Sequence, residues 1–420
     1  MKESLLKILN NKKLSILLFA LLFFLLEYEY YDFVNIPIFQ EKMGFRFEFI
    51  WWKFFIVKFL VAGLLYLNYN LKKHLYFVNS LFLIFLTFPV LIMYEFMPGT
   101  PFIISFSAIL FNVSLWAVSF AKTEINIKNF KINKKYSLLA LFAITVLMTI
   151  PFFTVFGFKI NTEALLFHDV YKIRAEAAEK STVLMSYFLN WLVKIIIPVG
   201  IILSIKQKKW FFSLVFVILQ IYLFSTGAHK SVFFSLFLVV LMFLPSFKSQ
   251  INFVLFGFLV LIITSKLISI TTGEIMPESI IVRRTFFLPA IIINDYFDFF
   301  KYNHLHLSHS ILKSFYHYPF ELQPEQIISK KYFNSPQGHC NSGFISDGFM
   351  NFGYLGILLN IIGLTIVFKI IEILKVSHIF SGILFIIVYT FVSSYFLTSL
   401  LTHGVILFLL LAIFILRENE

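Results

Sequence analysis

Runs of apolar residues long enough to cross a membrane recur along the whole chain. A helix needs about 20 apolar residues to cross the ~30 Å hydrocarbon core of a bilayer, and twelve intervals between polar breaks approach that length. The intervals are 14–31, 50–68, 75–94, 102–120, 137–158, 185–204, 210–225, 231–247, 251–270, 343–368, 379–399 and 402–416. Lipid offers no hydrogen-bond partner to an open backbone, so these runs predict an all-α polytopic membrane protein with about twelve transmembrane helices. The seventh, eighth and twelfth runs are short, and the number falls to ten or eleven if some of them are re-entrant.

The composition agrees with a membrane protein. Hydrophobic residues make up 59% of the 420 positions and charged residues only 14%, with a mean hydropathy of +0.87, which is far from the balance of a soluble domain. The single cysteine, Cys340, excludes an intramolecular disulfide, and no cysteine spacing indicates a zinc site. The basic N-terminus leads into an apolar run without a small-residue cleavage site, so we expect a retained first span.

Basic residues fall on one side of the predicted spans. With the N-terminus placed inside the cell, the inside termini and connections contain Lys12, Lys13, Lys72, Lys73, Lys122, Lys128, Lys131, Lys134, Lys135, Lys206, Lys208, Lys209, Lys248, Lys369, Lys375 and Arg417. Loops rich in lysine and arginine stay in the cytoplasm, which predicts that both termini are cytoplasmic. The net charge of +13 follows from this asymmetry and is no argument for binding nucleic acid.

Two outward segments, about 159–184 and about 271–342, are much longer than the other outward connections. The second greatly exceeds the usual 2–8 residues between bundled helices. Within it, "MPESIIVRRTFFLPAIIINDYFDFF" and "PEQIISKKYF" each begin with a proline and a glutamate suited to a first helical turn. We therefore expect a single membrane domain over 1–420, with short helices of these segments lying at the outer membrane face.

The stretch "LFSTGAHKSVFF" at 223–234 places Gly227, His229, Lys230 and a serine between two apolar runs. A nucleotide-binding loop needs two glycines at fixed spacing after a soluble strand. Tyr222 occupies the position of the first glycine, and the stretch falls on the outward side, so this class of site is excluded. The stretch predicts a turn between two spans, in which Lys230 either reaches lipid headgroups or forms a cationic corner of an outward cavity with His229.

Arginine is scarce on the outward side. Apart from Arg46, it occurs as Arg174 in the first long segment and as the adjacent Arg283 and Arg284 in the second. The planar guanidinium matches phosphate oxygens bidentately and stays charged at any relevant pH. The three arginines therefore indicate either contact with lipid headgroups or a site for a diphosphate held at the membrane surface, over which the two segments converge.

Three lysines lie within predicted spans. Lys58 and Lys194 are several residues from a helix end, where a cation costs about 2.5–3.5 kcal/mol on insertion scales, so either could face a polar cavity. Lys266 is one turn from the outer end of its span, and we expect it to extend to the headgroups.

The tenth run begins "NSGFISDGFMNFGYLG". Asp347 and Asn351, four residues apart, share one helix face, while Gly353 and Gly356 permit close helix approach. The carboxylate suits three roles: holding an arginine, accepting a proton from a sugar hydroxyl, or complementing the start of a helix. The second long segment also contains the histidines His304, His306, His309, His317 and His339. No cysteine or carboxylate spacing accompanies these histidines, so we expect solvated side chains and no metal site.

These motifs carry a resemblance to a known family. The turn "STGAHKS", the helix "RRTFFLP", the stretch "NSGFISDGFMNFGYLG" and an arginine in the middle outward segment, Arg174, resemble the patterns of bacterial O-antigen polymerases. The resemblance covers most of the chain in topology and short motifs in sequence. It implies a multi-spanning, metal-independent glycosyltransferase of the C-type class in the bacterial inner membrane, with its active site facing the periplasm.

The resemblance also implies a reaction. Such a polymerase transfers a growing glycan from undecaprenyl diphosphate to a new lipid-linked repeat unit, without a nucleotide or another cofactor. Arg174 and either Arg283 or Arg284 would bind the diphosphates of donor and acceptor, and either Asp347 or His339 would activate the acceptor hydroxyl. His229, Lys230, Lys194, Asn351 and Lys58 are the further candidates for contact with the substrates. Membrane lipids, a chain-length regulator and a flippase are the other partners that the resemblance implies.

Three alternative functions stay open. O-antigen ligases share this architecture and donor but have a glycine after a histidine of the large loop, with ten residues between the two. At that spacing His309 is followed by Phe320 and His339 by Met350, so the match fails. Lipid-linked oligosaccharide flippases have about twelve spans but usually short outward loops, which the 271–342 segment contradicts. An ion-coupled solute transporter would show two inverted halves with broken helices, and the sequence has no such symmetry.

Overall fold

The computed structural model describes residues 9–121, 134–166, 168–227 and 230–417. All regular secondary structure in this part of the chain is helical. Nine of its helical stretches are long and apolar enough to cross a membrane. These stretches are Lys12–Val34, Trp51–Asn70, Lys73–Phe96, Tyr136–Phe156, Val183–Lys206, Trp210–Gly227, Phe247–Thr272, Phe344–Ile373 and Phe396–Leu416. The chain is therefore a polytopic helical membrane protein.

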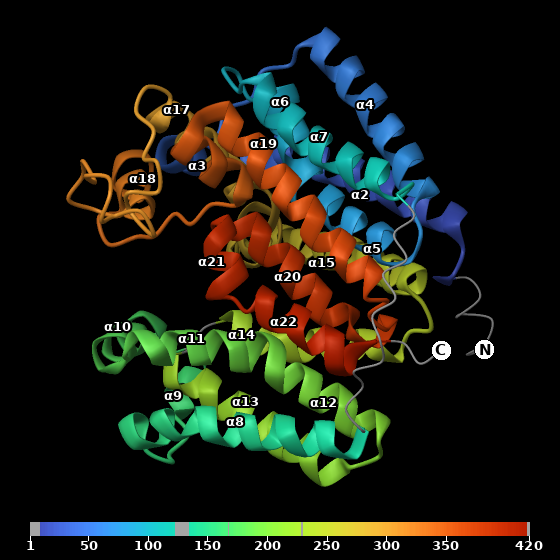
Figure 1. The fold of residues 1–420 in the computed structure, drawn as a ribbon. Helices are drawn as coiled ribbons and strands as arrows, with labels where there is room; N and C mark the ends of the chain where they lie inside the picture. The colour runs from blue at the N-terminus through green and yellow to red at the C-terminus, as the bar shows by residue number, and fades with distance from the viewer. Residues whose placement is uncertain (1–8, 122–133, 167, 228–229, 418–420) are drawn as a thin grey trace. The chain divides into compact units, whose positions relative to one another are not determined.

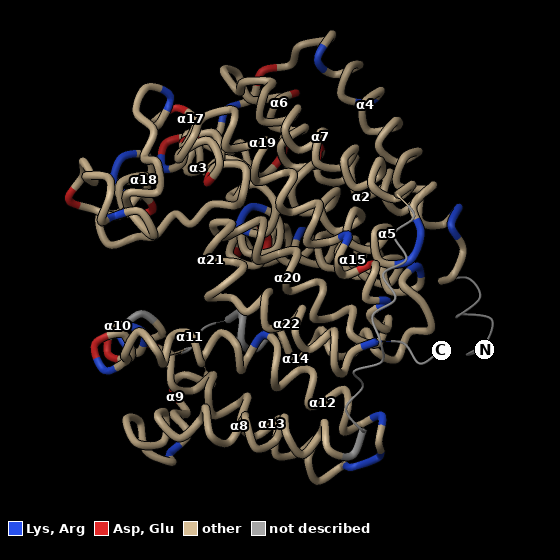
Figure 2. Tube along the Cα trace, in the orientation of Figure 1, with Lys and Arg blue, Asp and Glu red and all other residues tan. Residues whose placement is uncertain are grey.

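Each of the twelve predicted runs coincides with a helix. The seventh run lies in a stretch of 18 residues, and the twelfth lies in a stretch of 21 residues that is interrupted at Gly404. The shorter apolar helices are Phe102–Val118, Phe234–Phe243, which lies within the eighth run, and His378–Ser393. Figure 2 shows α7 (Phe102–Val118), α13 (Trp210–Gly227) and α20 (Ser381–Ser393) without a lysine, arginine, aspartate or glutamate along their length.

The helices form two compact units, labelled in Figure 1. Unit 1 comprises Met1–Thr123, Ser246–Ile370 and Val388–Phe396. Besides α7 and the last part of α20 it contains α2 (Lys12–Glu29), η1 (Tyr30–Val34), α3 (Pro37–Met43), α4 (Trp51–Asn70), α5 (Lys73–Phe82), η2 (Leu83–Thr87), α6 (Phe88–Phe96), α15 (Phe247–Thr272), α16 (Met276–Glu278), η5 (Ser279–Phe287), α17 (Leu288–Phe300), α18 (Pro324–Phe333) and most of α19 (Phe344–Ile373).

Unit 2 comprises Glu124–Pro245, Ile371–Ile387 and Leu397–Glu420. Besides α13 and the first part of α20 it contains α8 (Lys134–Phe156), α9 (Thr162–Leu165), α10 (Val170–Lys180), α11 (Val183–Trp191), η3 (Leu192–Ile196), α12 (Ile197–Lys206), α14 (Lys230–Leu238), η4 (Val239–Phe243), η6 (His378–Phe380), most of α21 (Phe396–Leu401), α22 (Val405–Leu411) and η7 (Ala412–Leu416).

Each unit is built around one buried span. In unit 1, every residue from His74 to Phe96 is buried, and Phe82 packs edge to face on Phe111 with ring centroids 4.6 Å apart. In unit 2, every residue from Leu192 to Ser204 is buried. The abundant phenylalanines therefore fill the interior of the helix bundle as well as its lipid-facing surface.

Three of the π-helical turns, η2, η3 and η5, have a common cause. Each is followed by a helix with proline at its second position: Pro89, Pro198 and Pro289. Proline has no backbone N–H and its ring clashes with the carbonyl four residues earlier, so the preceding turn widens to the π pattern. Lys194 lies in η3, and Arg283 and Arg284 lie in η5.

The helix α19 is interrupted in its first third. Its backbone leaves the helical region at Phe352 and Gly353, where Gly353 has φ +61°. Asn360 Nδ2 then donates a hydrogen bond to Phe344 O over 2.8 Å, which is possible only if residues 344–351 fold back on the helix that follows. The predicted span 343–368 is therefore a helical hairpin, whose second arm, 354–373, is about 30 Å long at 1.5 Å per residue.

The two helices predicted in the second long segment are confirmed. Pro277 and Pro324 lie in the first turns of α16 and α18, as proline at a helix start does. In α18, Gln323 and Gln326 also form a capping box. Between α17 and α18 the chain runs through turns without a helix. The first long segment contains α9 and α10.

Candidate functional site

Arg283 is buried without an acidic partner. Only 7% of the residue is exposed, and its Nε and Nη2 donate to Ser279 Oγ over 3.0 and 2.7 Å. Its Nη1 lies 2.8 Å from Met43 Sδ, and the guanidinium stacks 4.4 Å from the ring centroid of Phe39. Burial lowers the pKa of Arg283 to about 10, with a further contribution from Arg284, so the guanidinium of Arg283 is charged at neutral pH.

Arg284 is exposed and has no hydrogen bond or ion pair to any residue that the structure describes. Across the described chain, no carboxylate lies within 4.0 Å of either guanidinium. Two adjacent arginines, one of them buried, therefore have no carboxylate in contact with them in the part of the chain that the structure describes. Such an arrangement favours binding of an anion with several oxygens.

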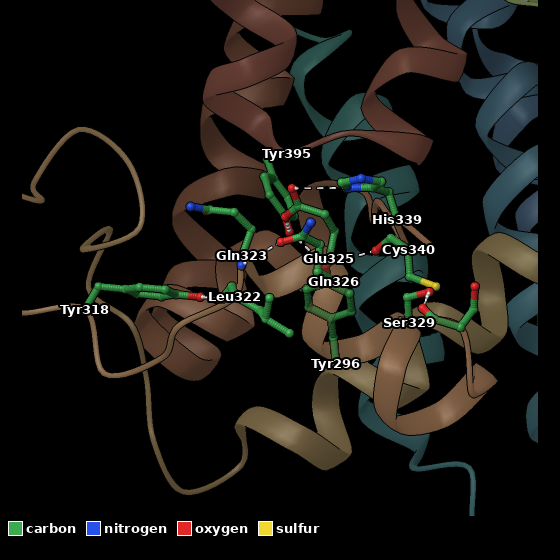
Figure 3. A network of polar contacts seen from close by, with 11 residues as sticks. Tyr296, Tyr318, Leu322, Gln323, Glu325, Gln326, Ser329, His339, Cys340 and Tyr395 are labelled. Carbon is green, nitrogen blue, oxygen red and sulfur yellow. Dashed lines mark hydrogen bonds and ion pairs between the residues drawn. The ribbon is translucent and has the colours of Figure 1, made fainter. Parts of the chain in front are cut away.

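A network of polar contacts, here called the Tyr296 network, joins α17, α18 and the segment before α19 (Figure 3). Tyr296 donates through its hydroxyl to Cys340 O over 3.0 Å, and the hydroxyls of Tyr296 and Tyr395 are 2.7 Å apart. Tyr395 donates to Glu325 Oε2 over 3.2 Å. The other oxygen of Glu325 is 3.9 Å from His339 Nδ1. The network therefore places an imidazole beside a carboxylate at the edge of unit 1.

The two residues predicted as alternative bases have different surroundings. Asp347 is 5% exposed; its Oδ2 accepts from the N–H of Phe396 and its Oδ1 from Asn351 Nδ2, both over 2.8 Å. The predicted shared helix face of Asp347 and Asn351 is thus present, and both carboxylate oxygens are used within the protein. In contrast, 55% of the His339 side chain is exposed.

Two further histidines of the second long segment are partly buried, and one of them, His309, lies close to the Tyr296 network. The ring of His309 is 5.8 Å from the ring of Tyr395, and burial lowers the pKa of His309 to about 4. Burial, and secondarily the nearby His306, also lower the pKa of His304. Both imidazoles are therefore neutral at pH 7. Sequence reasoning grouped these residues as solvated loop histidines, because the tertiary contacts that bury them have no local sequence signal.

Lys58 was expected to face a polar cavity and Lys266 to extend to the headgroups, but both lysines form ion pairs with carboxylates. Lys58 forms ion pairs with Glu27 and with Glu95, the latter over 2.7 Å. Lys266 pairs with Asp32 and Glu278 and does not extend alone to the headgroups. The acidic partners were missed because they lie in other helices.

In unit 2, α9 and α10 pack on the C-terminal end of α13. A hollow of about 160 Å³ lies there, lined by Lys159, Asn161, Ile173, Glu176, Ala177, Lys180, Ser225, Thr226 and Phe156. Arg174 is half-buried on α10, the helix that lines this hollow. The first long segment and the "STG" turn are thus adjacent.

His229 and the side chain of Lys230 lie outside the described residues, although Lys230 begins α14 as the predicted turn requires. Arg174 belongs to the other unit from Arg283, so their convergence over one cavity stays a prediction.

Lys194 is buried in the middle of its span. Its Nζ is 2.8 Å from His403 Nδ1, which is also 3.0 Å from Asn190 Oδ1. His403 lies in a break between α21 and α22, where Gly404 has φ +83°. Trp191 Nε1 donates to Leu401 O at this break over 2.8 Å. Sequence reasoning identified the lysine but missed the broken helix that faces it.

No three His, Cys, Asp or Glu side chains of the described residues are grouped so that they could hold a metal ion. Comparison with protein-family models, with curated proteins and with solved structures gives no match.

Proposed function

We propose that this protein is a glycosyltransferase of the O-antigen polymerase type, which joins undecaprenyl-diphosphate-linked repeat units at the periplasmic face of the bacterial inner membrane. The observation that carries the proposal is the Arg283–Arg284 pair, which has no carboxylate partner within 4.0 Å among the described residues. A diphosphate supplies the missing negative charge, and its oxygens suit the guanidinium geometry. The motif resemblance supports the same substrate class.

In the proposed reaction, a hydroxyl oxygen of the acceptor sugar attacks the anomeric carbon of the donor glycan. The bond between that carbon and the diphosphate oxygen breaks, and its electron pair leaves with undecaprenyl diphosphate. Negative charge grows on the departing group, where the fixed positive charges of Arg283 and Arg284 stabilise it. The hydroxyl proton passes to a base and then to water, so the step requires no nucleotide.

His339 is the better supported base of the two alternatives. Its side chain is largely exposed and lies beside Glu325, a carboxylate that favours the imidazolium formed when the base takes a proton. Asp347 instead has both oxygens bonded within unit 1. In this proposal Asp347 positions the hairpin of α19, and Asn351 holds the loop through its contact with the N–H of Leu307.

One observation favours a second candidate, a lipid-linked oligosaccharide flippase. Lys194 is a buried lysine without a carboxylate partner among the described residues, and it faces the broken stretch between α21 and α22. Buried charges beside discontinuous helices are typical of transport pathways. Under this alternative, Lys194 and His403 would be essential and the arginine pair would not.

A gene deletion separates these functions. In a host lacking this gene, a polymerase defect leaves a surface core with a single repeat, a ligase defect leaves glycan on the lipid carrier, and a flippase defect leaves repeat units inside the cell. We expect the single-repeat pattern when surface lipopolysaccharide is separated by size. An unchanged ladder of chain lengths would refute the proposed activity.

A further inference from the structure

A charge cluster at one end of the first span contains more carboxyl groups than cations. We call it the Lys266 cluster; it consists of Lys266 on α15, Glu29 on α2, Asp32 on η1 and Glu278 on α16. Lys266 Nζ pairs with Asp32, lies 2.9 Å from Glu278 Oε1 and lies 3.8 Å from Glu29 Oε2. Three carboxyl groups thus surround one ammonium group.

Two of the three carboxyl groups are removed from solvent. The side chains of Glu29 and Glu278 are each 1% exposed, whereas 40% of the Asp32 side chain is exposed. Water therefore reaches the carboxyl group of Asp32. Water does not reach Glu29 and Glu278 in this way. If both were ionised, desolvation and mutual repulsion would both oppose the second negative charge in a low-dielectric interior.

Three of the four carboxyl oxygens of Glu29 and Glu278 lack a hydrogen-bond donor. Neither oxygen of Glu29, nor Oε2 of Glu278, has a hydrogen-bond donor among the described residues. Both carboxyl groups nevertheless approach the same ammonium group, at 3.8 and 2.9 Å from Lys266 Nζ. Ionised carboxylates have only acceptor atoms, so a proton on one of the two groups supplies the donor that the protein does not.

We propose that the Lys266 cluster is a proton-binding site, in which one proton is held between Glu29 and Glu278. The groups that face this proton are Lys266, Asp32 and the rings of Tyr28 and Phe33, which lie 5.6 and 5.8 Å from Lys266 Nζ. The proton joins α2 to α16. Because Glu278 directly precedes Ser279, the acceptor for Arg283, the same link fastens the start of the arginine-bearing turn to the first span.

This inference does not depend on the proposed glycosyl transfer. It is tested by infrared spectroscopy of the purified full-length protein in lipid nanodiscs at pH 7, because protonated carboxylic acids have a carbonyl stretching band that carboxylates lack. Other buried acids contribute to that band, so the infrared spectrum of each variant is subtracted from that of the wild type. Glu29→Gln is expected to remove the contribution of one carboxylic acid, and Glu278→Gln is expected to do the same because Glu29 then ionises beside Lys266.

Asp32→Asn is the matched control, since Asp32 contacts the same lysine but is exposed, and its variant should keep the full band. Circular dichroism and elution volume establish that each variant is folded, and Glu278→Gln decides the question if Glu29→Gln does not fold. A carboxylic-acid band that is unchanged in both glutamine variants would overturn the proposal. A band that appears only when sodium is removed would overturn it as well, because the site would then hold a sodium ion.

Discussion

Asn360 donates a hydrogen bond from its side-chain amide to the carbonyl oxygen of Phe344, sixteen residues earlier, over 2.8 Å. This contact fixes the two arms of the α19 hairpin against each other and allows Gly348 to lie on Gly356. The other end of the short arm is held by the loop, where the N–H groups of Leu305 and His306 donate to Met350 O and Asn351 O. The motif "NSGFISDGFMNFGYLG" is therefore a folded element that positions Asp347.

The first prediction concerns the crossing of the two arms. A Cβ at Gly356 would lie 2.0 Å from Gly348 O, a backbone atom that has little room to move. Gly356→Ala should therefore lower the free energy of unfolding by about 1–3 kcal/mol, as other overpacked substitutions do. Thermal unfolding in detergent measures this effect. Gly257→Ala is the matched control because nothing lies within 4 Å of that position, and an equal response of the two variants would contradict the crossing.

The second prediction concerns Asp347. Its Oδ2 accepts from the N–H of Phe396 and its Oδ1 from Asn351 Nδ2, which also donates to the backbone carbonyl oxygen of Asp347. Asp347→Ala therefore leaves the N–H of Phe396 without an acceptor, and we expect a loss of about 1–3 kcal/mol for this unpaired donor. Asp347→Asn keeps one acceptor oxygen and should lose less stability. If Asp347→Ala unfolds at the wild-type temperature, the carboxylate does not hold the hairpin.

The third prediction is a pH dependence that arises at Asp295, which lies on α17 outside the candidate spans. Burial, followed by repulsion from Asp298, raises the pKa of Asp295 to about 8, whereas an unfolded aspartate titrates near 3.9. Between these values the folded protein keeps a proton that the unfolded chain releases. The stabilising contribution is therefore complete below about pH 4 and is lost progressively as pH rises to about 8.

Asp295→Asn removes this dependence because the amide does not titrate. The variant should match the wild type near pH 4 and exceed its stability at pH 8 by on the order of 2 kcal/mol, the cost of a buried group without a hydrogen-bond partner. Thermal unfolding of both proteins across this range measures the difference. Parallel curves for the two proteins would show that the carboxyl of Asp295 is ionised in the folded state.

The fourth prediction separates the two adjacent arginines. Arg283 is buried and bonded to Ser279, so Arg283→Ala should reduce both stability and glycan polymerisation. Arg284 is exposed and makes no hydrogen bond or ion pair with a described residue, so Arg284→Ala should reduce polymerisation at unchanged stability. Unfolding temperature and surface glycan length, measured on the same pair of variants, test this difference. Reduced stability in Arg284→Ala would contradict the assignment of that side chain to the ligand.

The features that were predictable from the sequence are those with a local signal. The twelve apolar runs identify the helices because hydrophobicity is continuous along a span, and Pro277 and Pro324 identify two helix starts because proline suits a first turn. The reversal at Gly353 was not predictable, since a glycine in an apolar run has the same local signal whether it packs or turns.

The ion-pair and hydrogen-bond partners of the charged groups could not be predicted from the sequence either. Lys266 meets Asp32 across 234 positions, and Lys194 meets His403 across 209, so no spacing rule connects them. The proline after each of three π-helical turns is visible in the sequence. Its effect on the preceding turn, which in η5 sets the position of Arg283, is visible only in the folded chain. Candidate residues were therefore identified more readily than their roles.

The most direct test of the proposed function is polymerisation by the purified protein in liposomes supplied with undecaprenyl-diphosphate-linked repeat units. We predict that the wild type joins the units into longer chains, and that Arg284→Ala lowers the rate by about tenfold to a hundredfold, as the loss of a charge-assisted hydrogen bond of about 1.5–3 kcal/mol implies. Lys313→Ala, which removes an exposed cation of the same segment, should keep the wild-type rate. Repeat units that stay single with the wild-type protein, or an Arg284→Ala variant as active as the wild type, would contradict the account.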